Sequence, residues 1–413
     1  MERQTSIGTS IFLARDSGWF FEKPLEIICA NEIHEVVPKL SQVCELTSAE
    51  NLWAAGYIAY EAGKAFEPHL AVHEQLDIPF LWFAVYETYA PYQPLSFMEG
   101  SWSLGEWQPL IYKDYYVSAI RRIKQHIENG DVYQVNYTFP FRAEFRGDTV
   151  SWFETLQASQ QAMYAAYLNT GRYHILSLSP ELFFRLKDAH IVCKPMKGTR
   201  KRGVMYHSDI LIQKELESSE KDKAENLMIV DLIRNDLGKI AVTGSITVTK
   251  LFETERYPTV WQMTSTIEAK THANILDIFR ALFPSGSVTG APKIQMTKIV
   301  SQLEPCPRGV YCGCVGWIGP DRQAQFNVAI RTPVVDVQEN TVTCSVGGGI
   351  VWDSSPLDEY EECLTKHRFT KAVRPDFQLL ETILFEGTFF LLEEHLERLE
   401  QSALFFGFPF DRK

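Results

Sequence analysis

The clearest pattern in the chain is an alternation of apolar and polar residues from Tyr133 to Phe145. One set of alternate positions is apolar throughout: Tyr133, Val135, Tyr137, Phe139, Phe141, Ala143 and Phe145. The other set is mostly polar and begins with Gln134. A period of two over about 13 residues predicts one long β-strand in a large antiparallel sheet. We expect the Gln134 side chain to point away from the apolar core, towards a polar space.

Shorter runs predict further strands and helices. The expected strands are Tyr173–Ser177, Leu182–Leu186, His190–Lys194, Phe326–Val337 and Thr341–Val346. Apolar residues at helical spacing, with N-cap residues before them or glycine after them, predict helices from Asp114 to Gly130, over about Glu220–Leu237, from near Pro292, and from Ser355 to about Ala372. Short strands and helices are expected within the first 110 residues. Strand runs mixed with helix runs favour an α+β fold over strict βαβ alternation.

The character of the chain changes after residue 373. Arg374-Pro375-Asp376 predicts a linker, Phe377–Phe385 a strand and Glu393–Phe406 an amphipathic helix. About forty residues cannot build a useful core of their own. We therefore expect three regions, 1–110, 111–373 and 374–413, of which the last docks on the main body or begins something longer.

Composition and charge exclude several classes of function. The 413 residues carry a net charge of −12, which argues against a nucleic-acid partner or an anionic membrane surface. No run of roughly 18 apolar residues predicts a membrane helix, and the first residues do not resemble a secretory signal. The eight cysteines are scattered, which favours reduced thiols in a cytoplasmic protein. A local cationic pocket for an anionic small molecule remains compatible with the overall charge.

Lys197 is the first candidate for chemistry. It lies between Pro195 and Gly198, a context that predicts a turn. Burial and neighbouring cations both disfavour the charged ammonium form of a lysine, and Arg200-Lys201-Arg202 follow directly. A neutral lysine amine is a nucleophile. The alternative on this segment alone is a solvated basic turn.

Two glycine-rich segments and one arginine could hold an anion. Ser285–Lys293 opens a predicted helix, where free amides suit a carboxylate or phosphate, although a simple capped turn is the commoner explanation. Gly347–Gly349 permits a close approach of backbone to a ligand, or forms a turn or bulge. Arg331 offers a planar fork that matches a carboxylate, or occupies an exposed alternate position on its predicted strand.

Four glutamates complete the candidate set. Glu225 and the pair Glu359 and Glu362 lie on two separate predicted helices, and their oxygens could jointly hold Mg²⁺. Acids near the start of a helix are also common for structural reasons. Glu181 lies at a break between two strands, where it could protonate a leaving hydroxyl or cap a turn.

Together these segments resemble the chorismate-binding enzyme family. The resemblance covers about residues 50–372 and is carried, in order, by Gly130–Asn136, Ser179–Phe183, Lys194–Gly203, Glu225–Lys239, Ser287–Lys293, Asn327–Thr332, Gly347–Val351 and Glu359–Glu362. It implies an α+β sandwich of two large antiparallel sheets with flanking helices, and chorismate in the cleft between them. Residues 1–110 would then be the N-terminal part of the sandwich and 111–373 its catalytic region.

The resemblance also implies roles for individual residues. Lys197 would be the nucleophile and Glu181 the general acid, while Glu225 and Glu362, with Glu359 close by, would bind Mg²⁺. The remaining matched positions would hold the substrate: Gln134, Thr289, Gly290, Ala291, Lys293, Arg331, Gly348 and Gly349.

Two positions distinguish branches of the family. Relatives that form isochorismate carry a general-base lysine where this chain has Gln134, and anthranilate synthases typically carry alanine where it has Lys197. This resembles the branch that aminates chorismate at C4, in para-aminobenzoate and folate synthesis, with ammonia from solution or from a glutamine amidotransferase subunit. Two residues depart from the family pattern, since Gln262 replaces a histidine of many relatives and Trp317 a common tyrosine. The alternatives are an anthranilate synthase component I and an inactive chorismate-binding or regulatory subunit.

The end of the chain carries a second resemblance. Leu380–Ile383, His395–Leu399 and Ser402-Ala403 are similar to the opening of 4-amino-4-deoxychorismate lyase, a pyridoxal phosphate enzyme. The lysine that binds the cofactor in that family would lie beyond residue 413. We therefore expect a truncated lyase-like segment at 374–413 that does not bind pyridoxal phosphate.

Overall fold

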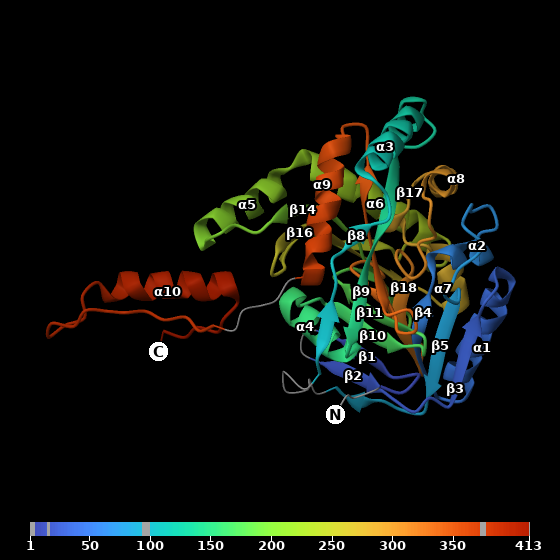
Figure 1. Cartoon of the computed structure of the whole chain (residues 1–413), viewed down its shortest axis with the longest axis horizontal. Helices are drawn as coiled ribbons and strands as arrows, with labels where there is room; N and C mark the ends of the chain where they lie inside the picture. Colours follow the sequence, from blue (N-terminus) through green and yellow to red (C-terminus); the bar gives the residue numbers. More distant parts are fainter. Residues whose placement is uncertain (1–4, 15–16, 93–99, 372–376, 413) are drawn as a thin grey trace.

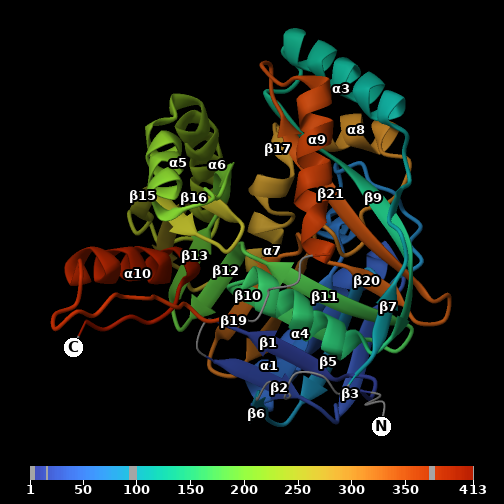
Figure 2. The same cartoon turned by 60° about the vertical axis from the view of Figure 1, so that its left-hand side comes forward.

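A computed structural model describes residues 5–14, 17–92, 100–371 and 377–412. Two large antiparallel sheets form its centre (Figures 1 and 2). The first has 11 strands in the order β17 (Gly290–Ala291), β9 (Gln134–Gly147), β21 (Thr341–Ile350), β20 (Val334–Asp336), β11 (Tyr173–Ser179), β10 (Tyr164–Asn169), β1 (Ser10–Leu13), β2 (Gly18–Phe21) and β6 (Ala90–Pro91), with β7 (Trp102–Leu104) and β8 (Gln108–Pro109) beside β9.

The second sheet has 10 strands. Their order is β14 (Met196–Lys201), β16 (Val260–Lys270), β13 (His190–Lys194), β12 (Leu182–Lys187), β19 (Gln323–Val328), β18 (Cys314–Gly319), β4 (Trp53–Ile58), β5 (Leu81–Tyr86) and β3 (Glu26–Ala30), with β15 (Thr247–Arg256) beside β16. Apolar residues of both sheets share one buried cluster, in which Phe12 and Ala166 of the first sheet meet Tyr57 and Trp82 of the second. The expected α+β sandwich is confirmed.

Helices cover the outer faces of the sheets. The second sheet packs against α1 (Val36–Ala49), α6 (Glu220–Gly238) and α7 (Ile275–Leu282), and the first against α3 (Lys113–Glu128), α4 (Thr149–Gln160), α8 (Lys293–Leu303) and α9 (Pro356–His367). Shorter elements are α2 (Gly63–Phe66), η1 (Ile33–Glu35), η2 (Tyr60–Ala62), η3 (Gly286–Val288) and η4 (Arg368–Lys371). The predicted starts of α6, α8 and α9 are confirmed, whereas α5 (Tyr206–Ser218) was not predicted.

The long predicted strand exists as β9, but both of its faces are buried near its start. Gln134, Asn136 and Thr138 are 2%, 7% and 4% exposed, so the polar face of the strand is enclosed by the protein there. The polar side chains are buried because the fold supplies partners: Asn136 donates to the carbonyl of Val288, and Thr138 donates to Glu304. Buried polar groups are tolerated when they are hydrogen-bonded in this way.

Three other predictions on strands are wrong in detail. Lys197 lies within β14 and not on a turn, because Gly198 adopts a φ of 89° and the strand continues through a bulge. The predicted strand Phe326–Val337 is two strands, β19 and β20, which belong to different sheets, and Arg331 lies in the segment that crosses between them. Gly347–Gly349 forms neither a turn nor the end of a strand but lies inside β21, so the predicted strand Thr341–Val346 continues to Ile350.

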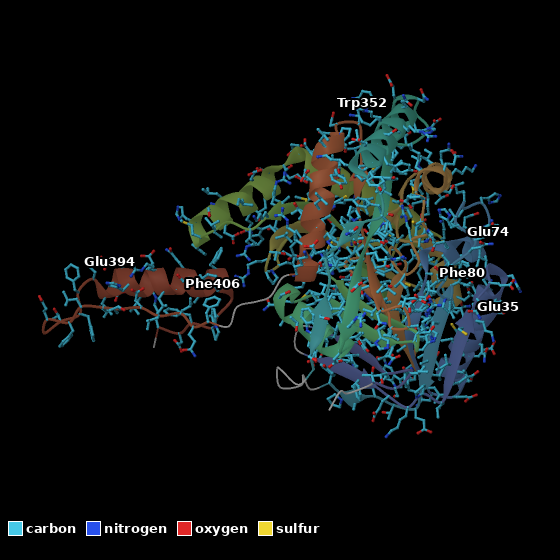
Figure 3. All side chains as sticks on the ribbon, in the orientation of Figure 1. Glu35, Glu74, Phe80, Trp352, Glu394 and Phe406 are labelled. Atoms are coloured by element: carbon cyan, nitrogen blue, oxygen red, sulfur yellow. The ribbon has the colours of Figure 1, made fainter. Side chains whose placement is uncertain are left out.

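The end of the chain is partly as expected. The helix is confirmed as α10 (Leu392–Phe406), but Phe377–Phe385 forms no strand beyond an isolated bridge from Phe385 to Phe389. Helix α10 lies beside α5, with its C-terminal end towards the body and its first turn pointing away (Figures 2 and 3). The predicted linker Arg374–Asp376 and the expected helix end at Ala372 lie outside the described residues.

Candidate active site

Three segments that are far apart in the sequence meet at Lys197. A Cβ atom added at Gly349 would lie 2.7 Å from Lys197 Nζ and 2.2 Å from Gln134 Nε2. Lys197 comes from the second sheet, while Gln134 on β9 and Gly349 on β21 come from the first. Gln134 Nε2 is buried and has no hydrogen-bond partner among the described residues. The two sheets therefore bring an amine and an unsatisfied amide together beside Gly349, whose lack of a side chain leaves room for both.

Burial dominates the electrostatics of Lys197. It lowers the pKa of the ammonium group, and the nearby cation Lys366 lowers it further, against the opposing effect of Glu225, Glu181 and Glu362. The lowered pKa of Lys197 agrees with the sequence analysis, but the cation that contributes to it is not one of those expected.

Two of the three cations that follow Lys197 in sequence form ion pairs elsewhere. Arg200 pairs with Asp222 at 2.7 Å, and Arg202 pairs with Asp209 at 2.6 Å. The relevant neighbour, Lys366, comes instead from α9. The amine of Lys197 thus loses its charge more easily than an exposed lysine, because it is buried near another cation.

Glu181 lies between β11 and β12 and is 3% exposed. Burial raises the pKa of its carboxyl to about 7, although a hydrogen bond with Ser287, the charge of Lys197 and the backbone of Met196 each act to lower it. A substantial fraction of this carboxyl is therefore protonated near neutral pH. Such a group can give a proton to a leaving oxygen.

Helices α6 and α9 supply three further carboxylates. Burial raises the pKa of both Glu225 and Glu359, and the negative charge of Glu362 adds to the effect in each case. Glu362 itself has a lowered pKa because Lys366 forms an ion pair with it at 2.7 Å. Glu359 accepts a hydrogen bond of 2.7 Å from Ser354. The mutual influence of these groups shows that the two helices direct negative charge towards one space.

These residues fit a hard divalent cation by their donor chemistry. Within the described part of the chain, no three His, Cys, Asp or Glu side chains converge closely enough to hold a metal ion. Mg²⁺ commonly takes only one or two carboxylates and completes its shell with water and substrate oxygens. Glu225 is half-buried on α6 and Glu362 is exposed on α9, and two carboxylates from separate helices match that requirement.

The glycine-rich loop is built into the first sheet. Gly290 and Ala291 form β17, which pairs with Val135 and Gln134 of β9. The Thr289 hydroxyl donates to the carbonyls of Ser285 and Gly286 at 3.1 and 3.2 Å. The loop thus brings its backbone to the same end of β9 as Gln134.

Lys293 follows this loop at the start of α8. Its Nζ pairs with Asp236 at 3.2 Å and donates to the carbonyl of Pro284 at 3.0 Å. The structure therefore places this ammonium among protein partners, and its predicted contact with a substrate carboxylate stays a prediction.

Arg331 carries a positive charge without an acidic partner. The residue is half-buried, and burial lowers the pKa of the guanidinium; no acidic side chain in the described ranges forms an ion pair with it. The backbone φ of Arg331 is 50°, which turns the chain between β19 and β20. A half-buried guanidinium without an acidic partner is suited to an anionic ligand.

Gly348 lies on β21, where an added Cβ atom would come within 3.2 Å of Glu359 Oε2.

Sequence reasoning missed two residues of the site. Lys366 donates to the carbonyl of Gly347 at 3.0 Å in addition to its pairing with Glu362. Its only signal was a spacing of four residues from Glu362 on one helix. Gln262 was considered only as a departure from the family pattern, yet it contacts the backbone next to Lys197.

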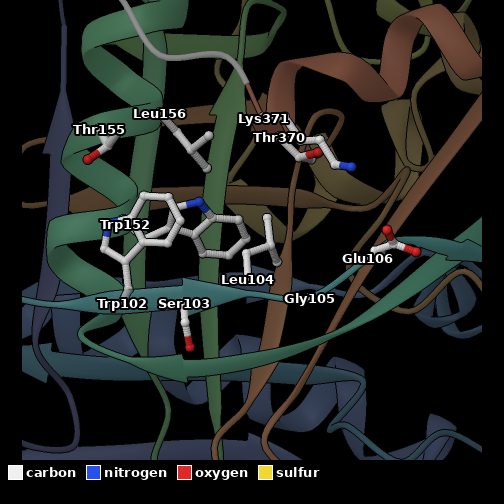
Figure 4. Close-up of a pocket in the computed structure, with 10 residues that line it drawn as sticks. All are labelled: Trp102, Ser103, Leu104, Gly105, Glu106, Trp152, Thr155, Leu156, Thr370 and Lys371. Carbon is white, nitrogen blue, oxygen red and sulfur yellow. The ribbon is translucent and has the colours of Figure 1, made fainter.

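A separate hollow of about 620 Å³ lies among β7, α4 and η4 (Figure 4). Its lining comprises Trp102, Ser103, Leu104, Gly105, Glu106, Trp152, Thr155, Leu156, Thr370 and Lys371. None of these residues belongs to the candidate site.

The eight cysteines are all free thiols. Among the described helices, none combines the length and apolar character needed to cross a bilayer.

Comparisons with known proteins bear on this geometry. Aminodeoxychorismate synthase component 1 of Klebsiella aerogenes is 39% identical over 262 residues, which are 63% of this chain and 58% of that protein. The protein of the same name from Salmonella typhimurium is 40% identical over 262 residues, 63% of this chain and 57% of that protein. Anthranilate synthase component 1 of Aquifex aeolicus is 36% identical over 262 residues, 63% and 53% of the two chains. The chain thus spans little more than half the length of these curated relatives.

Solved structures confirm the fold. Anthranilate synthase component I from Streptococcus pneumoniae matches with a TM-score of 0.74 at 23% identity, over 90% of this chain and 94% of that one. A structure from Bacillus anthracis described as a 2,3-dihydroxybenzoate-specific isochorismate synthase, DhbC, matches with a TM-score of 0.73 at 18% identity, over 89% and 96%. The sequence model for chorismate binding enzymes matches residues 19–372, and on this evidence the chain belongs to the chorismate-binding enzyme family.

Proposed function

We propose that this chain catalyses the Mg²⁺-dependent amination of chorismate at C4 to 4-amino-4-deoxychorismate. The observation that carries the proposal is the amine of Lys197, whose pKa is lowered by burial, close enough to Glu181 for each charge to shift the pKa of the other group. Relatives at 39% and 40% identity bear the name aminodeoxychorismate synthase component 1, which supports the same chemistry.

The reaction would proceed by two displacements. The neutral amine of Lys197 adds to C2 of chorismate, the ring electrons shift, and the C4–O bond breaks. Glu181 gives its proton to the departing hydroxyl, which leaves as water. Ammonia then attacks C4, the electrons shift back, and the C2–N bond breaks so that the Lys197 amine leaves with its electron pair. The new ammonium group at C4 returns a proton to Glu181, and the sum is one ammonia consumed and one water released.

Other residues would bind and orient the substrate. Arg331 and the amides of Gly348 and Gly349 would receive the enolpyruvyl carboxylate, because the guanidinium is half-buried and has no acidic partner in the described ranges. Thr289–Ala291 and Lys293 would hold the substrate from the other side. Glu225 and Glu362 would hold Mg²⁺, which supplies positive charge that neutralises the ring carboxylate when bound.

The nitrogen source in this proposal is ammonia from a separate component. The relatives are named as component 1 of a synthase, a name that implies a further component. We propose that a glutamine amidotransferase fills this role and that the product serves para-aminobenzoate and folate synthesis.

One experiment tests the proposal. The full chain is incubated with chorismate, ammonium and Mg²⁺, and the products are identified by mass. The proposal requires 4-amino-4-deoxychorismate with the enolpyruvyl group retained. Release of anthranilate and pyruvate without added lyase would instead support an anthranilate synthase, a name that a 36% identical relative bears. Binding of chorismate without turnover would support a regulatory subunit.

A further inference from the structure

The strand that carries Lys197 is bulged at that residue. On β14 and β16, Met196 pairs with Thr264, but the next pair is Thr199 with Gln262. Lys197 and Gly198 therefore stand opposite Met263 alone, so β14 holds one extra residue. A bulge of this kind changes the direction of a side chain and is frequent beside active sites. The aim of the Lys197 amine depends on how firmly this bulge is held.

Gln262 holds the bulge from the neighbouring strand. Its side chain, in a residue that is 6% exposed, donates from Nε2 to the carbonyl of Gly198 at 2.9 Å. Its Oε1 accepts a hydrogen bond of 2.8 Å from the Thr199 hydroxyl. The carbonyl can only accept, which fixes the orientation of the amide. The Gln262 side chain thus forms hydrogen bonds with Gly198 and Thr199, the two residues directly after Lys197.

The opposite side of the bulge is held by α6. A Cβ atom added at Gly198 would lie 3.0 Å from Asp222 Cβ, so the backbone is packed closely against this residue. The Asp222 carboxylate accepts hydrogen bonds of 2.7 Å from Arg200 and 2.5 Å from Ser219. The peptide that follows Lys197 is therefore confined between an amide of β16 and an acid of α6.

We infer that Gln262 is a positioning residue, which fixes the β14 bulge so that the Lys197 amine is aimed at the substrate ring. The inference rests on the proposed function, because it assigns Lys197 as the nucleophile. A misplacement of a catalytic group by about 1 Å can reduce catalysis by about 100-fold. Gln262 itself touches neither the amine nor the substrate in this scheme.

The test compares Gln262→Met, which keeps the length of the side chain and removes both hydrogen bonds, with Gln213→Met. Gln213 lies on α5 and donates to Thr254 of β15 at 3.0 Å, so it serves as a matched control in a contact with another strand. We expect Gln262→Met to lower kcat by about 100-fold while KM for chorismate changes by less than about 3-fold, because the carboxylate-binding residues lie on other elements. Gln213→Met should leave both constants unchanged.

A second readout needs no turnover. Acetylation of Lys197 by a small anhydride, followed by peptide mass, reports how often the amine leaves its buried position. We expect faster labelling in Gln262→Met than in the wild type or in Gln213→Met. Should Gln262→Met fail to fold, Thr199→Val removes only one of the two bonds, and we expect a loss of about 10-fold in kcat.

The outcomes separate this inference from the proposed function. A Gln262→Met protein with lower melting temperature but wild-type kcat and wild-type labelling would reduce Gln262 to a structural residue and overturn the inference. A wild-type protein that forms no 4-amino-4-deoxychorismate would refute the proposed function, whereas the labelling experiment would still report whether Gln262 fixes Lys197.

Discussion

Replacing Glu181 by glutamine should make the protein more stable and inactive. The carboxyl is buried, and its pKa in the folded protein is about 7 against 4.5 for the free group. Each pH unit between these two pKa values corresponds to about 1.4 kcal/mol, so ionisation of Glu181 lowers the free energy of unfolding by about 3 kcal/mol. Glutamine has nearly the same shape but does not ionise. The variant therefore does not lose this stability as the pH rises.

The sign follows from proton binding. Between pH 4.5 and about 7 the folded state keeps a proton on Glu181 that the unfolded state has lost, so stability falls as pH rises through this window. Above about pH 7 both states are ionised and the full loss is present. Glu61, whose pKa is also raised to about 7 by burial, contributes in the same direction but cancels when variant and wild type are compared.

The assay is urea unfolding of both proteins followed by tryptophan fluorescence. We expect the free energy of unfolding of Glu181→Gln, relative to wild type, to increase by about 3 kcal/mol between about pH 4 and about pH 8. The exposed Glu45→Gln serves as the control and should show no such trend. A difference between Glu181→Gln and wild type that does not change with pH would refute the reasoning that burial raises the pKa of this carboxyl.

Three further substitutions test the rest of the site. Gly349→Ala places a methyl group 2.7 Å from Lys197 Nζ and 2.2 Å from Gln134 Nε2, so kcat should fall at least about 10-fold with a loss of about 1–3 kcal/mol in stability, and wild-type kcat would contradict the proximity of these groups. Arg331→Met should raise KM for chorismate by about 10- to 100-fold, whereas an unchanged KM would exclude a contact with the substrate carboxylate. Glu362→Gln should raise the Mg²⁺ concentration needed for half-maximal activity at least about 10-fold, as measured by titration after chelation, and an unchanged requirement would remove Glu362 from the metal site.

The main strands and helices could be predicted because their signals are local, whereas the sandwich was implied by the resemblance to the family. The alternation on β9 and the starts of α6, α8 and α9 depend on neighbouring residues, which sequence patterns report directly. The burial of the polar face of β9 could not be predicted in this way. It depends on Glu304 and on the carbonyl of Val288, which lie more than 150 residues away in the chain.

The same distinction applies to the site. Lys197 and Glu181 were identified from local motifs. The turn expected at Lys197 is instead a bulged strand, because this segment pairs with β16 (Val260–Lys270), which is distant in the sequence. The environment of the amine was attributed to Arg200-Lys201-Arg202, yet the cation that lowers its pKa is Lys366 on α9. Gln262 and Lys366 were missed because their hydrogen bonds to Gly198 and Gly347 join different elements.

The central claim is that the nitrogen of Lys197 forms a covalent bond with the substrate. Its most direct test is to incubate the wild-type protein with chorismate and Mg²⁺ in the absence of ammonium, and to determine the mass of the peptide that contains Lys197. We expect this peptide to gain the mass of chorismate less one water, and to lose the gain on addition of ammonium. Formation of 4-amino-4-deoxychorismate by Lys197→Ala at the wild-type rate, with no adduct on the wild-type peptide, would contradict the account.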